Sequence, residues 1–82
     1  MNEEQILALL SELEASQQNT LLKLGRRFVP LLTEEDVLQP NDYPELEENP
    51  HFRYEEGILA GIRTALMAFR STLKSSSEAP RA

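Results

Sequence analysis

The only histidine lies at a spacing that metal-binding helical bundles use. His51 follows Glu48 by three residues and precedes Glu55 by four. An E-x-x-H motif within one helix places both ligands on the same face in carboxylate-bridged bundles, which combine two such motifs with two further glutamates. Here the Asn49-Pro50 pair is typical of a helix start, so Glu48 would precede the helix, and a symmetric dimer would have to supply the second motif. A dimeric carboxylate/histidine metal-binding bundle with these ligands is therefore the alternative hypothesis, and a first-turn histidine at the domain edge is the simpler one.

Other catalytic chemistry has less support in the sequence. Ser11, Ser16 and Ser71 have no histidine at helical spacing, and the chain contains neither a Gly-rich phosphate-binding loop nor a cysteine. A disulfide or a thiolate metal site is excluded for the same reason. We therefore expect no enzyme activity and no cofactor.

The charge pattern bears on the kind of partner. The net charge is −6; residues 33–56 hold nine acids and one base, whereas residues 57–82 hold four bases and one acid. An acidic chain is a poor match for a nucleic-acid backbone. Three bases on one face of the second long helix, Arg63, Arg70 and Lys74, are the feature that would favour nucleic acid, and bases so placed are more often a solvated surface.

No apolar run suggests a membrane partner or export. None approaches the ~20 residues that span a bilayer, and the apolar run at residues 6–10 follows Glu3 and Glu4 and is too short for an export signal. We expect a soluble, cytoplasmic protein.

Two long helices must position any site. The first is predicted to begin after Asn2, with Gln5 at the capping-box position, and to end between Leu24 and Val29, because Pro30 restricts the residue before it. Its apolar stripe follows the 4-3-4-3 spacing of a helix interface: Ile6, Leu10, Leu13, Gln17, Thr20, Leu21, Leu24 and Phe28.

The connector and the second helix follow from similar signals. Thr33 is predicted to cap a short helix reaching about Leu38, and a turn-rich segment with three prolines then leads to the Asn49 cap. The second long helix is predicted over residues 50–74. Its stripe comprises Ile58, Ile62, Ala65, Phe69 and Leu73. Residues 1–74 thus form one domain, and residues 75–82, which lack large apolar side chains, are expected to be a disordered tail.

The two helices are of similar length and are predicted to form an antiparallel hairpin, giving an all-α fold. Antiparallel pairing brings opposite charges together at both ends, Glu3 and Glu4 near Arg70 and Lys74, and Arg26 and Arg27 near Glu55 and Glu56. Exposed pairs contribute ~0–1 kcal/mol each, so they select orientation more than they stabilise.

Apolar residues outside the stripe predict a further interface. Leu7, Leu9 and Leu22 exceed what one partner helix can cover, so we expect a homodimer that forms a four-helix bundle, or another helical protein as partner. In the second helix a strip of small residues would allow close helix packing, with Gln17 and Thr20 opposite the glycines: Gly57, Gly61, Ala65 and Ala68. Glycines tolerated in an exposed helix are the simpler alternative.

The segment 40–56 places aromatic residues among acids and prolines. Tyr43, Phe52 and Tyr54 could form a recognition surface, because aromatic rings carry much of the energy at interfaces. Alternatively Tyr43 and Phe52 fold back with Leu46 as a plug at the end of the hairpin. Taken together, these patterns favour a small non-catalytic protein-interaction module, such as an adaptor, a chaperone-like protein or a regulatory subunit, through fold-level analogy with other helical hairpins.

Overall fold

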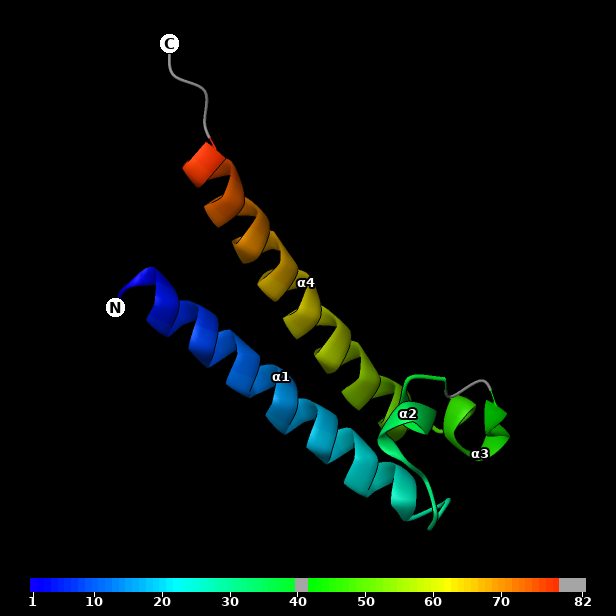
Figure 1. Ribbon diagram of the computed structural model, residues 1–82. Coiled ribbons are helices and arrows are strands. Elements are labelled where there is room, and N and C mark those ends of the chain that lie inside the picture. The colour runs from blue at the N-terminus through cyan, green and yellow to red at the C-terminus, as the bar shows by residue number, and fades with distance from the viewer. Residues whose placement is uncertain (40–41, 79–82) are drawn as a thin grey trace.

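The chain folds as a helical hairpin with two short helices in its connector. The computed structural model describes residues 1–39 and 42–78, the last three as backbone only. The helices are α1 (Glu3–Arg26), α2 (Glu34–Val37), α3 (Pro44–Glu47) and α4 (Pro50–Glu78). α1 and α4 run antiparallel, α2 and α3 lie at the closed end, and the long helices diverge toward the other end (Figure 1). The predicted all-α hairpin is confirmed, and no strand occurs in the described ranges.

The predicted helix starts are formed by side-chain caps. Asn2 Oδ1 accepts a hydrogen bond from Gln5 N at 2.8 Å, and Asn2 N donates to Gln5 Oε1 at 2.8 Å. This capping box satisfies backbone donors that a helix leaves unpaired. Thr33 caps α2 in the same way with Asp36, and Asn49 Oδ1 accepts from Phe52 N at 2.9 Å to start α4.

Two predictions about the helices need correction. α3 was not expected, because Pro44 suggested a turn; it stands in the first turn of α3, where proline is tolerated. α4 continues to Glu78, four residues past the predicted end at Lys74. The disorder expected of the tail stays a prediction. The remainder of the predicted tail, residues 79–82, lies outside the described residues.

The hydrophobic core lies toward the closed end of the hairpin. Both long helices, both short helices and the loop after α1 contribute to it, and Phe52, Leu32 and Leu46 are completely buried. The buried apolar residues are Leu21, Leu22, Leu24, Leu32, Val37, Leu46, Phe52, Leu59 and Leu66. The connector thus does more than reverse the chain, because it seals one end of the helix pair.

Gly25 allows this closure. It is buried on α1, and a methyl group at its Cα would overlap Leu32 Cδ2 and lie 3.3 Å from Phe52 Cε2. The loop after α1 is further held by Arg26, whose Nε donates to the Leu32 carbonyl at 2.8 Å. Leu32 therefore packs directly against the helix backbone where any other residue would interfere.

The buried side of α4 differs from the predicted stripe. Phe52, Leu59 and Leu66 form the buried row, whereas Ile58 and Ala65 are exposed. The remaining members of the predicted stripe, Ile62, Phe69 and Leu73, are half-buried. α4 packs against both α1 and α3, so its buried side is not set by α1 alone.

Polar contacts cross between the long helices near their middle. Arg63 Nε donates to Glu14 Oε2 at 2.9 Å, and Gln17 Nε2 donates to Glu55 Oε1 at 2.7 Å and to the Glu55 carbonyl at 3.0 Å. In the described part of the chain Arg63–Glu14 is the only ion pair between α1 and α4. The ion pairs predicted at the two ends are not formed, since the helices diverge at one end and the connector occupies the other (Figure 1).

Candidate functional site

The proposed metal ligands are not brought together. His51 Nε2 lies 3.8 Å from Glu55 Oε2, but Glu48 is the C-cap of α3 and is separated from α4 by the Asn49 cap. Over the described residues, no three His, Asp or Glu side chains are grouped to hold a metal ion. The E-x-x-H motif spans the break between α3 and α4, so Glu48 and His51 do not share one face of a single helix.

The connector aromatics divide between core and surface. Phe52 and Leu46 are fully buried, and Tyr43 packs against the same core. These residues therefore form the plug that was the alternative to a recognition surface, and Phe52 cannot contact a partner in this conformation. Tyr54 alone of the three is open to solvent, with 67% of its surface exposed.

Tyr43 and Asp36 connect the two short helices. Thr33 N donates to Asp36 Oδ2 at 3.0 Å, and the hydrogen bonds with Thr33 hold the pKa of Asp36 below its ordinary value. Partial burial raises the pKa of Tyr43 above its ordinary value, and the neighbouring negative charge of Asp36 adds to the effect. Asp36 thus caps α2 while lying beside the N-cap residue of α3.

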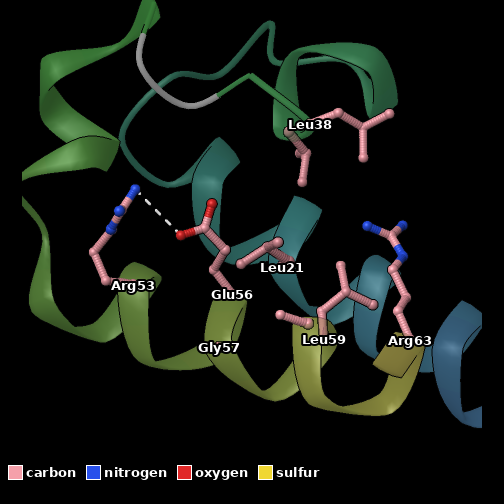
Figure 2. A pocket seen from close by; sticks show the side chains of 9 residues that line it. Leu21, Leu38, Arg53, Glu56, Gly57, Leu59 and Arg63 are labelled. Carbon is pink, nitrogen blue, oxygen red and sulfur yellow. Dashed lines mark ion pairs between the residues drawn. The ribbon is translucent and has the colours of Figure 1, made fainter. Parts of the chain in front are cut away.

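A cavity of about 370 Å³ lies between α2 and α4. Leu21 and Leu59 form its apolar floor, Leu38 projects over it from the end of α2, and Arg53 and Arg63 stand on opposite sides (Figure 2). Both arginines are already paired, Arg53 with Glu56 at 3.2 Å and Arg63 with Glu14. The cavity therefore has an apolar floor and a polar rim whose charges are largely satisfied.

The leucines predicted to contact a partner occupy three different environments. Leu22 is buried in the core with Val37, so it offers no interaction surface, and its assignment to a partner interface is corrected. Leu7 is half-buried. Leu9 has 44% of its surface exposed, and its contact with a partner stays a prediction. The difference arises because the connector packs over the last turns of α1 and leaves its first turns uncovered (Figure 1).

One side of the hairpin carries exposed apolar residues. Gln17 and Glu55 meet on one edge of the α1–α4 pair, and Arg63, which lines the cavity, lies on the other edge. Leu13 lies one helical turn before Gln17, and Ile58 one turn after Glu55, so both share that edge. Leu13 is 45% exposed and Ile58 37%. By the same helical spacing, the surface that we call the open face comprises Ile6, Leu9, Leu13 and Thr20 of α1 with Ile58, Gly61, Ala65 and Phe69 of α4.

The open face ends in a groove between the diverging helices. The groove has a volume of about 720 Å³ and lies between the first turns of α1 and the later turns of α4. Ile6, Phe69 and Leu73 form its apolar lining, and Glu3 and Glu4 stand at its edge. Half-buried apolar side chains therefore continue from the open face into the groove.

The small residues of α4 are not used for packing within the chain. Gly57, Gly61, Ala65 and Ala68 are exposed, and no atom lies within 4 Å of a methyl group placed on either glycine. The prediction that Gln17 and Thr20 cover the glycines is wrong, because Gln17 reaches Glu55 instead and Thr20 is exposed. Packing of these residues against another chain stays a prediction. The glycine that permits close packing within the chain is instead Gly25 of α1.

Comparisons with known proteins identify no family for this chain. Searches with protein-family models, among curated proteins and among solved structures gave no significant match. No helix in the described ranges combines the length and apolar character that a membrane crossing requires.

Proposed function

We propose that this protein is a non-catalytic protein-interaction module that binds a helical partner through the open face. The observation that carries the proposal is the position of Leu9, Leu13 and Ile58, which are large, apolar, exposed and gathered on one side of a small hairpin. Covering apolar surface stabilises a complex by roughly 25 cal/mol per Å² before the costs of association.

The shape of the open face favours a helix as the bound element. Two long helices lying side by side present parallel rows of side chains, and helices pack by setting such rows into one another. The eight residues of the face are all uncharged, and the carboxylate of Glu55 on the same edge is hydrogen-bonded to Gln17. Interface centres are depleted of charge in the same way, because a buried charge without a partner is costly.

The connector offers a second, weaker contact. Glu45, Glu47 and Glu48 are exposed around α3, and Tyr54 is exposed on the first turn of α4. Such a surface suits a basic segment of a partner. Since Phe52 and Tyr43 serve the core, the connector contributes less to binding than the open face.

Affinity capture with variants of the full chain tests the proposal. The double variant Leu9→Glu/Leu13→Glu places charge on the open face, and Leu31→Glu is the matched control because Leu31 is 91% exposed in the loop after α1. We expect specific partners, a coexpressed untagged copy included, to be retained by the wild-type chain and by the control and lost by the double variant. Circular dichroism should show both variants to be folded. Identical retention by all three chains would contradict the proposal.

A further inference from the structure

From the open face we infer that its occupant is a second copy of this chain, in a four-helix bundle where α1 of each copy packs on α4 of the other. The inference rests on the proposed function and specifies its partner. The two-fold axis runs parallel to the helices, so every helix has antiparallel neighbours. Such an isologous contact requires a surface that is complementary to itself.

Side-chain size supplies this self-complementarity. The α1 half of the open face carries Leu9 and Leu13, whereas the α4 half carries Gly61 and Ala65 at corresponding positions. Gln17 is level with Glu55, and Glu14 with Arg63. Counting along both antiparallel helices places Leu13 level with Gly61, and Leu9 with Ala65, to within about one turn.

A two-fold axis parallel to the helices leaves every residue at the same height along the helices. Residues that are level within one chain are therefore also level between the two copies. Leu13 of each chain then lies over Gly61 of the other, where no side chain of its own chain stands within 4 Å of an added methyl group. The alternative two-fold axis stacks α1 on α1 and α4 on α4. Leucines would then meet leucines while the glycines faced each other across an unfilled gap, which interiors packed to crystal-like density disfavour.

The area of the face suits a small specific interface. With the groove, the face runs along α1 from Glu3 to Thr20, so at 1.5 Å per residue it is about 27 Å long. Across two packed helices it is about 20 Å wide, so each copy offers roughly 540 Å², and the two copies together bury about 1,100 Å², near the lower end for specific interfaces. The groove lined by Ile6, Phe69 and Leu73 continues this surface and is filled by the partner's helix ends.

Sedimentation equilibrium of the purified full chain at micromolar concentration tests for the second copy. The expected mass is twice the chain mass of 9.3 kDa. Leu13→Glu should raise the dissociation constant at least about a hundredfold, since it would bury an unpaired charge, whereas Leu31→Glu should leave it unchanged. A monomeric wild-type chain overturns the inference, and so does a dimer that both variants retain. If the capture experiment still finds other proteins that depend on the open face, the proposed function survives.

Cysteine cross-linking tests the arrangement. The chain contains no cysteine, so single substitutions report only contacts between chains. An oxidised mixture of Leu13→Cys and Gly61→Cys chains should form the mixed disulfide dimer in preference to either homodimer, because the two positions face each other only across copies. A dominant Leu13→Cys homodimer, or a yield no higher than that of an exposed control pair with Leu31→Cys, overturns the arrangement.

Discussion

The Gln17 side chain bridges the two long helices by donating from Nε2 to both the Oε1 and the carbonyl of Glu55, at 2.7 and 3.0 Å. This contact stands between the sealed end of the hairpin, with its buried core, and the diverging helices of the other end. It is half-buried and charge-assisted, which makes it stronger than a hydrogen bond in water.

Gln17→Ala should therefore lower the free energy of unfolding by about 1–2 kcal/mol, measured by urea denaturation. Gln18→Ala is the matched control. Its oxygen accepts only a long 3.4 Å hydrogen bond from Arg63, so a change below about 0.5 kcal/mol is expected. Equal effects of the two substitutions would show that Gln17 does not hold the helices together.

Gly25→Ala should destabilise the fold by about 1–3 kcal/mol, because the added methyl group overlaps Leu32 and overpacking carries costs of this size. Gly57→Ala makes the same chemical change on α4, where nothing lies within 4 Å. It should instead stabilise the fold by up to about 1 kcal/mol, since alanine favours a helix over glycine. Thermal melts of both variants measure the contrast, and a stabilising Gly25→Ala would be inconsistent with the close packing of Leu32.

Gly61→Leu should weaken self-association at least about tenfold, because a leucine there occupies the space assigned to Leu13 of the second copy. The control is Gly57→Leu, which has the same effect on helix propensity. Gly57 lies outside the open face and lines the cavity between α2 and α4. Sedimentation equilibrium of the two variants gives the comparison. Similar dimerisation constants for both would count against close packing at Gly61.

The pKa of Tyr43 should lie above 10.0, and Asp36→Asn should lower it by removing the neighbouring charge. Because the folded-state pKa is raised, the contribution of Tyr43 to stability is present below pH 10.0 and is lost as the pH rises through the higher folded value. Ultraviolet titration of the phenolate in a Tyr54→Phe background isolates Tyr43. An unshifted titration, or one that Asp36→Asn leaves in place, would mean that α2 and α3 are not coupled through this pair.

Sequence rules predicted the helix ends better than the helix faces. Asn2, Thr33 and Asn49 act locally, through hydrogen bonds to residues three positions away, so their role follows from spacing alone. The buried side of α4 depends on which elements pack against it, and α3, whose proline-containing segment resembled a turn, is one of them. Leu59 and Leu66 were therefore missed as core residues, although Phe52, Leu59 and Leu66 follow one another at intervals of seven residues.

The same distinction applies to the candidate site. Exposure of Leu9 was predictable because it lies off the main stripe of α1, whereas burial of Leu22 required knowledge that the connector packs over the end of that helix. Gly61 and Ala65 were identified as a packing surface from their size. That they face away from α1 became apparent only from the structure, since propensity does not indicate which neighbour a helix face meets.

Isotope-filtered nuclear Overhauser spectroscopy on a mixture of labelled and unlabelled chains is the sharpest test of the proposed dimer, because it reports contacts between chains only. In that dimer, cross-peaks are expected from the Leu13 methyl groups of one chain to the Gly61 α-protons of the other. Two results would contradict the proposed dimer. In the first, the Leu13 methyl groups give no contact to another chain at a concentration where the protein is dimeric; in the second, they contact only Leu13 of the other chain.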